Sequence, residues 1–522
     1  MKNLKKSNST EIMSTEPVAK TVASKSTGGK SRKRTSQHSP DVKSYRSNVS
    51  HDPCNDPAWY AKTPQEMADA ASIPYSWSTG TEITLSGGVY NSNENLNKVR
   101  APGIMCFNLY PTVGYANSAT APINVAAQSL YTFIRHQNSG SANYDAPDLM
   151  LYVLAMGEVY SYINWLTRVY GVAGLYAGHN RYLPDGLLTA MGVNPTDVRM
   201  NIAQLRYGIN LLINKAASFC IPTGLPYFNR KAFLYASIYT EGTSWKDQLY
   251  MFNPAGFYKY TLDAEQTGKL EIQQTASNLT VEEILTFGEN LLQPLIMSED
   301  MNIMSGDILK AYGPNSIVKF APVPTEYTVT PTFNIEVLEQ MKNATPLGGF
   351  DFSSPVTQDA TKAYLQCSNV HTFSAGAQKA IGLMLCTDQI ITTTTDAVTP
   401  SLTMENTRLT QIGSTTSYSL QDQSVVTLNP MTELVHSVNI WYLNSSSQYA
   451  SLLYTSFAYP PTSTDTIARM LLLGNAFQFR PQIQIAGLSS DASSITQYLI
   501  NTAFDNYAVL HRSDLMQMNE TA

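Results

Sequence analysis

Side chains that could bind a polyanion are concentrated in the first fifty residues of the chain. This arm contains eleven basic residues against three acidic ones and carries a net charge of +8. Clustered cations gain affinity for nucleic acid because they displace counterions from phosphates, whatever the base sequence. The pattern therefore predicts that the arm binds a polyanion through Lys2, Lys5, Lys6, Lys20, Lys25, Lys30, Arg32, Lys33, Arg34, Lys43 and Arg46.

The arm has little with which to build a core. Tyr45 is its one aromatic residue, and its few aliphatic side chains follow neither a helical nor an alternating period. We therefore expect a disordered coil whose ends lie roughly 40 Å apart. The charges would also fit a targeting signal around Arg32-Lys33-Arg34 or a solubilising tail, and both of these alternatives remain open.

The remaining residues form an acidic body with a net charge of −14. The chain has 522 residues, of which 43% are hydrophobic and 10% aromatic, so it can build sizeable cores. Only 14% are charged, below the roughly 25% of an average soluble protein. Either much of the surface packs against neighbouring subunits, or the surface is rich in uncharged polar side chains.

The most apolar stretch, Leu149 to Tyr176, predicts a buried helix rather than a membrane span. Glu158 and Arg168 interrupt it, so no run approaches the roughly 18 apolar residues that a span requires. We therefore expect no stable membrane insertion. The N-terminus is rich in lysine but lacks the apolar block of a secretory signal, which predicts synthesis in the cytosol.

Motifs for metal binding and catalysis are missing. The five cysteines are far apart and form no Cys-x-x-Cys pair, which predicts reduced thiols, and the histidines have no zinc-binding spacing. Gly28-Gly-Lys-Ser31 is a broken phosphate loop, because Ser24 stands where its first glycine is required. There is no Gly-x-Ser-x-Gly elbow or Gly-Asp-Asp turn. We predict no metal, no cofactor and no enzymatic activity.

Helix signals dominate the first part of the body. Thr63-Pro-Gln-Glu66 predicts a short helix from Pro64 to about Ala71, and Asn194-Pro-Thr-Asp197 predicts the start of a long one. Thr280-Val-Glu-Glu283 is a capping box, and Ser305-Gly-Asp307 is typical of a helix entry.

After Tyr312 the pattern changes to β-branched runs separated by turn residues. Strands are expected around Ile390–Thr395, Ser424–Leu428 and His436–Tyr442. Thr466–Leu473 and Ile495–Met516 then favour helices again. The sequence thus predicts an α+β protein with a disordered arm at residues 1–50. Residues 51–312 and 463–522 would form a helix-rich domain, into which a β-rich domain at 313–462 is inserted.

Four motifs, in order behind a basic tail, resemble the capsid proteins of picobirnaviruses. They are Asn55-Asp-Pro-Ala-Trp-Tyr60, Asp69-Ala-Ala-Ser-Ile-Pro74, Pro102-Gly-Ile-Met105 and Pro111-Thr-Val-Gly114. The order of the four motifs is more specific than any single one of them. The likeness extends from Asn55 to about Leu262.

The resemblance implies a helix-rich shell domain, a protruding domain and dimers that assemble into an icosahedral particle around double-stranded RNA. The arm would then lie inside the virion and contact RNA without base specificity, after synthesis of the protein in the host cytoplasm. Some family members lose this arm by proteolysis, but no cleavage site can be assigned here. Two alternatives are a replication-associated protein with a basic tether and a monomeric RNA-binding protein.

Overall fold

The computed structural model describes residues 82–84, 98–100, 103–140, 143–175, 183–242, 247–352, 354–359, 361–373, 376–394, 397–415, 424–444, 448–459, 470–471, 473–491, 493–501, 506–510, 513 and 516. All of them belong to one compact unit, Ser76–Ala522, and the other unit, Met1–Tyr75, holds none of them. The predicted arm and the predicted helix Pro64–Ala71 lie outside the described residues.

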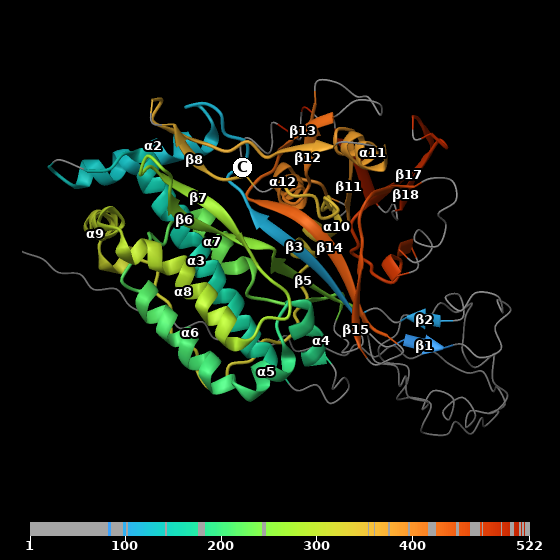
Figure 1. The fold of residues 1–522 in the computed structure, drawn as a ribbon, viewed down its shortest axis with the longest axis horizontal. Helices are drawn as coiled ribbons and strands as arrows, with labels where there is room; N and C mark the ends of the chain where they lie inside the picture. The colour runs from blue at the N-terminus through green and yellow to red at the C-terminus, as the bar shows by residue number, and fades with distance from the viewer. Residues whose placement is uncertain are drawn as a thin grey trace, which may run out of the picture. The chain divides into compact units, whose positions relative to one another are not determined.

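A mixed β-sheet runs through the middle of the described part of the chain (Figure 1), where its strand order is β15-β14-β3-β5-β4. The central strands β3 and β5 are parallel, and the other neighbouring pairs are antiparallel. Both central strands are almost entirely buried, which agrees with their nearly continuous apolar sequences. The strands are β3 (Ile104–Pro111), β4 (Tyr239–Thr240), β5 (Leu249–Pro254), β14 (Glu433–Leu443) and β15 (Tyr449–Leu453).

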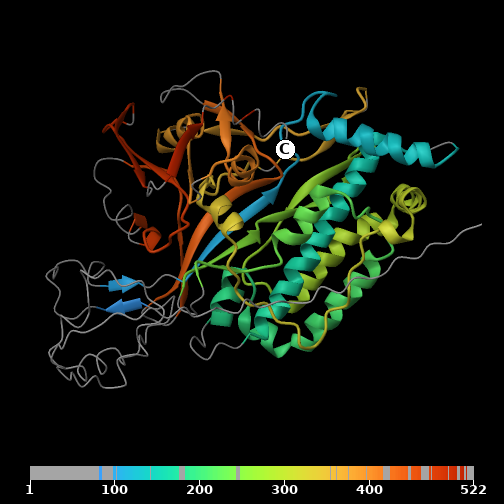
Figure 2. The same cartoon turned by 180° about the vertical axis from the view of Figure 1, so that it is seen from behind.

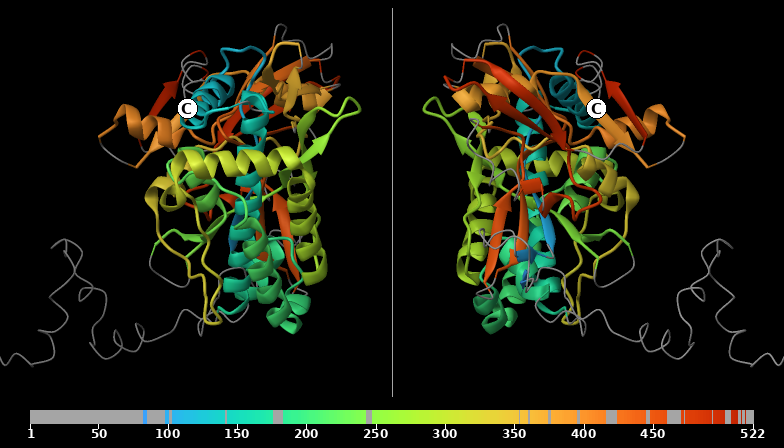
Figure 3. Two further views of the ribbon diagram at one scale, coloured as in Figure 1. Left: turned by 90° about the vertical axis from the view of Figure 1, so that its left-hand side faces the viewer. Right: turned by 90° about the vertical axis from the view of Figure 1, so that its right-hand side faces the viewer.

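A helical layer lies on one side of this sheet. Most of the helices and strands that follow α10 (Ile335–Lys342) in the chain lie on the other side (Figures 1 and 2). At the centre of the layer is α3 (Ala146–Ala173), which contacts the neighbouring helices along its length (Figure 3). Asp145 and Asp148 form a capping box at its start, and nearly all of its side chains are buried. The predicted buried helix is thus confirmed. Its neighbours are α2 (Pro122–Gln137), α4 (Leu183–Ala190), α6 (Ile202–Ala216), α7 (Pro226–Leu234), α8 (Val281–Met297) and α9 (Glu299–Tyr312).

The helix expected after Asn194 is divided into two. The Asn194 side chain accepts hydrogen bonds from the amides of Thr196 and Asp197, so α5 (Pro195–Met200) begins where the cap predicts. Asn201 then leaves helical geometry at φ −113° and ψ 26°, and α6 starts at the next residue. The prediction of a single long helix is therefore wrong, although α6 buries an apolar face that includes Leu205, Ile209 and Leu212.

The capping box of α8 is present, with Thr280 and Glu283 bonded reciprocally. Ser305–Asp307, in contrast, lies within α9 rather than at a helix entry. The antiparallel hairpin β6 (Gly256–Leu262) and β7 (Gly268–Gln274), which the helical pattern did not indicate, packs against α3 and α8. Among the helices that the structure describes, none is both long enough and apolar enough to cross a bilayer.

The expected strands after Tyr312 are confirmed as β11 (Gln389–Thr393), β13 (Ser424–Asn429) and β14. Because β14 pairs with β3, a strand from the predicted insertion 313–462 belongs to the central sheet. The boundaries of that insertion remain a prediction. Further elements here are η3 (Pro314–Ser316), α10 (Ile335–Lys342), β8 (Thr357–Asp359), β9 (Tyr364–Gln366), β10 (Val370–Phe373), α11 (Gly376–Leu385), α12 (Pro400–Asn406), β12 (Ile412–Ser414) and β16 (Phe457–Tyr459).

The helical prediction for Ile495–Met516 is wrong for residues 495–501 and 506–510, which are strands. The segment contains β18 (Ile495–Asn501), which pairs with β17 (Ile483–Leu488), and β19 (Asn506–Leu510), which pairs with β11. Strand pairing, in a local hairpin for β18 and with a distant strand for β19, thus decides the conformation of residues whose spacing alone suggested a helix. Strands β1 (Glu82–Thr84) and β2 (Lys98–Arg100) form a separate antiparallel pair. With its helices and mostly antiparallel strands, the chain is confirmed as an α+β protein.

Candidate functional site

The basic residues predicted to bind RNA all lie outside the described residues. The structure therefore brings none of the eleven into a site, and their contact with RNA stays a prediction. Lys2, Lys5, Lys6, Lys20, Lys25, Lys30, Arg32, Lys33, Arg34, Lys43 and Arg46 belong to the unit Met1–Tyr75.

The two charged residues that interrupt the apolar stretch of α3 are buried. Glu158 contacts Lys231 of α7 at 2.8 Å between Oε1 and Nζ, and each side chain is 1% exposed. Burial raises the pKa of Glu158 although Lys231 opposes this effect. Arg168 donates a hydrogen bond to the carbonyl of Ser237 at 3.2 Å, and burial lowers its pKa to about 10. Charges in a buried helix require polar partners, and here Lys231 of α7 and the carbonyl of Ser237, which follows α7, serve as such partners.

A second buried carboxylate, Glu433, begins strand β14 and connects three segments. Its Oε2 atom lies 3.4 Å from Arg230 of α7 and 3.8 Å from Arg408, which follows α12. The Thr432 hydroxyl donates to Oε1 of Glu433 at 2.7 Å. Burial opposes ionisation, but Arg230, Arg408 and Lys231 outweigh it and hold the pKa of Glu433 at about 2. This network ties the helical layer to the central sheet.

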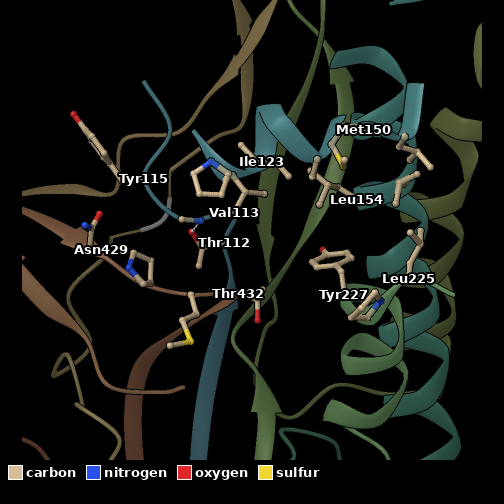
Figure 4. A pocket seen from close by; sticks show the side chains of 18 residues that line it. Thr112, Val113, Tyr115, Ile123, Met150, Leu154, Leu225, Tyr227, Asn429 and Thr432 are labelled. Atoms are coloured by element: carbon tan, nitrogen blue, oxygen red, sulfur yellow. Dashed lines mark hydrogen bonds between the residues drawn. The ribbon is translucent and has the colours of Figure 1, made fainter. Parts of the chain in front are cut away.

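An apolar pocket of about 290 Å³ lies beside this network (Figure 4). It is formed by the segment after β3, the first half of α2, the first third of α3, the start of α7 and the turn before β14. Sequence reasoning did not indicate it, because its walls come from five separate segments. Its lining residues are Thr112, Val113, Gly114, Tyr115, Pro122, Ile123, Ala126, Leu130, Met150, Val153, Leu154, Leu225, Pro226, Tyr227, Asn429, Pro430, Met431 and Thr432.

The outer face of α6 has a stripe of exposed, uncharged side chains, and Met200 is exposed at the end of α5. Met200 and Tyr207 are 73% and 71% exposed, and Leu211 is 39% exposed. Tyr207 and Leu211 are four residues apart and lie on one side of α6, and Met200 is the last residue of α5. The exposed positions between and after them are Ala203, Gln204 and Asn214. We call these six residues the α5–α6 face.

The described cysteines are free thiols, as predicted. Cys106, Cys367 and Cys386 are buried and Cys220 is partly buried. Burial raises the pKa of Cys106 to about 12 and that of Cys367 to about 11, so both are protonated at neutral pH. Cys54 lies outside the described residues. In the parts of the chain that the structure describes, no three His, Cys, Asp or Glu side chains gather as metal ligands would.

Comparisons with known proteins agree with the sequence motifs. The family described as "Picobirnavirus, Capsid protein" matches residues 59–456. The capsid protein precursor of Human picobirnavirus (strain Human/Thailand/Hy005102/-) is 33% identical over 315 residues, which cover 59% of this chain and 56% of that protein. The match therefore spans little more than half the length of this curated relative.

A solved structure has a similar fold. The X-ray crystallographic structure of the picobirnavirus capsid matches with a TM-score of 0.74 and 20% sequence identity. The match covers 89% of this chain and 97% of the other. The resemblance carried by the four motifs between Asn55 and Gly114 is thus confirmed. Because the family match covers most of the sequence, the chain belongs to the picobirnavirus capsid protein family.

Proposed function

We propose that this chain assembles as dimers into an icosahedral shell that encloses a double-stranded RNA genome. The observation that carries the proposal is the likeness of fold over 97% of the chain of a solved picobirnavirus capsid. A fold retained over nearly the whole subunit supports the same kind of assembly. The protein would then lie in the virion after synthesis in the host cytoplasm.

The α5–α6 face is the surface that we assign to contacts between copies. The centres of protein interfaces are poor in charge and rich in aromatic and methionine side chains, which is the composition of this face. Tyr207 and Met200 would both be removed from water by a neighbouring subunit, which favours association.

The basic arm is the part to which we assign RNA contact. Its eleven cations are spread along its length, so they can neutralise successive phosphates without reading bases. Residues 51–312 and 463–522 would supply the shell and residues 313–462 the protrusion, apart from β14 and β15, which belong to the central sheet. We assign the dimer contact to this protrusion.

Sedimentation of the purified full-length chain, with electron microscopy of the same fractions, tests the proposal. We expect closed particles that sediment far ahead of a single chain of 57.5 kDa and contain nuclease-protected RNA. A stable monomer under all conditions would instead favour a monomeric RNA-binding protein. Closed particles without RNA would support assembly into a shell but contradict the enclosure of RNA.

A further inference from the structure

The apolar pocket beside α2 has an accessible rim and a buried floor. Tyr115 and Ala126 are exposed at the rim, and Met150, Val153 and Leu154 of α3 are buried at the floor. In Figure 4, Tyr227 extends from α7 across the space between α3 and the segment after β3. The cavity can thus be entered from the surface beside α2.

The lining lacks charge. None of the 18 residues that line the pocket is Asp, Glu, Lys, Arg or His. The nearby charges, Arg230, Arg408 and Glu433, pair with one another rather than line the cavity. An ion entering the pocket would lose its hydration without gaining a counter-charge, which excludes carboxylate, phosphate and ammonium ligands.

The threonine hydroxyls of the lining already have partners. The Thr112 hydroxyl accepts hydrogen bonds from the Gly114 amide at 3.2 Å and from Asn369 at 3.1 Å. The Thr432 hydroxyl donates to Glu433 and accepts from Arg408. The pocket therefore presents mainly hydrocarbon, from the side chains of Ile123, Leu154 and their neighbours.

The volume sets the size of the occupant. An apolar cavity of about 150 Å³ stays dry and binds benzene, and this pocket of about 290 Å³ is roughly twice as large. It can hold two or three aromatic rings, or an aliphatic chain of roughly ten carbons.

We propose that the pocket binds a small, neutral, apolar molecule. Such a ligand contacts α2, α3 and α7 on one side and the turn Asn429–Thr432 on the other. Binding to the folded chain alone stabilises it in proportion to the logarithm of ligand concentration. The ligand thus joins the helical layer to the segment that leads into β14. This proposal does not depend on particle assembly.

N-phenyl-1-naphthylamine, a neutral fluorophore that brightens in apolar surroundings, is the probe. Its anionic counterpart, 8-anilino-1-naphthalenesulfonate, has the same rings and a sulfonate. Ala126→Trp places a large side chain at the rim on an exposed position of α2. Val125→Trp is the matched control, because Val125 is exposed on the same helix but does not line the pocket.

We expect saturable binding of the neutral probe, with one site per chain, to the full-length wild type and to V125W. Binding to A126W should be at least about tenfold weaker, and the anion should bind the wild type at least about tenfold more weakly than the neutral probe. Circular dichroism checks that both variants fold. Equal binding of the neutral probe to all three proteins, equal binding of the anion, or no saturable binding would overturn the proposal. Sedimentation of the same samples reports assembly separately.

Discussion

At the scale of single residues, the pKa values of two buried carboxylates near Lys231 shift in opposite directions. Glu158 has one cationic partner, Lys231, and burial prevails, so its pKa is raised. Glu433 lies near Arg230, Arg408 and Lys231, and these cations prevail over burial, so its pKa falls from 4.5 to about 2. Glu433 is therefore ionised at neutral pH.

Replacing Glu433 by glutamine should destabilise the fold. Glu433→Gln leaves the buried Arg230 and the partly buried Arg408 without their carboxylate, and breaking a buried ion pair in this way costs about 3–5 kcal/mol. Urea unfolding followed by tryptophan fluorescence measures the change. Glu265→Gln, at an exposed position between β6 and β7, is the control and should shift stability by less than about 0.5 kcal/mol. Equal effects of the two substitutions would contradict the role of the network.

The stability that Glu433 contributes should depend on pH in the acid range. Its pKa is lower in the folded chain, so the contribution is complete above its ordinary pKa of 4.5 and is lost as the pH falls towards about 2. The difference in unfolding free energy between the wild type and Glu433→Gln should therefore shrink across this window. The raised pKa of Glu158 changes the pH dependence of stability in the opposite direction. Glu158 is present in both proteins, so its contribution largely cancels in the difference in unfolding free energy. A constant difference would show that Glu433 does not titrate as described.

At the scale of elements, helix caps were predictable from the sequence and the pairing of strands was not. The starts of α5 and α8 follow from caps whose hydrogen bonds lie within three residues. Strands β6 and β7 lie in a part of the chain whose pattern indicates helices, and the spacing of residues in β18 also favours a helix. Their conformations depend on pairing, and β18 pairs with β17. The pocket was unpredictable because its walls come from five separate segments, whereas Glu158 and Arg168 marked α3 as a buried helix and not a membrane span.

Charge placed on the α5–α6 face should weaken assembly without unfolding the subunit. Tyr207→Glu combined with Leu211→Glu puts two carboxylates on a surface that we assign to contacts between copies, and burying them there would cost desolvation energy. Sedimentation should move from particles to small species. Gln128→Glu, on the exposed side of α2, adds a carboxylate elsewhere and should leave particles intact. Particle yields that match between the double variant and this control would place the contact on another surface.

At the scale of the whole molecule, charge separates a basic arm from an acidic body. The arm carries +8 and the remainder −14, so an assembled shell would attract RNA through its arms and not through its body. This asymmetry can be predicted directly, because charge is counted without a structure. Whether the arm faces the inside or the outside of a particle, in contrast, depends on how the subunits assemble.

Deleting residues 1–49 should leave assembly intact and lower the RNA content of the particles. The deletion removes all eleven cations assigned to phosphate contact, while the family match begins only at residue 59. The ratio of absorbance at 260 nm to that at 280 nm, measured on purified particles, reports the change. Truncated particles with as much RNA as intact ones would show that the arm does not capture the genome.

The position of β14 in the central sheet affects the order of folding during synthesis. β3 is made early, but one of its two neighbours is β14, and Asn108 bonds Ser437 across 329 positions of sequence. Until the ribosome has released Glu433–Leu443, one edge of β3 has no partner, and closing so long a loop is slow. A prematurely terminated chain would therefore expose an open sheet edge and be recognisable to chaperones as incomplete. Only a nearly full-length chain can complete this sheet.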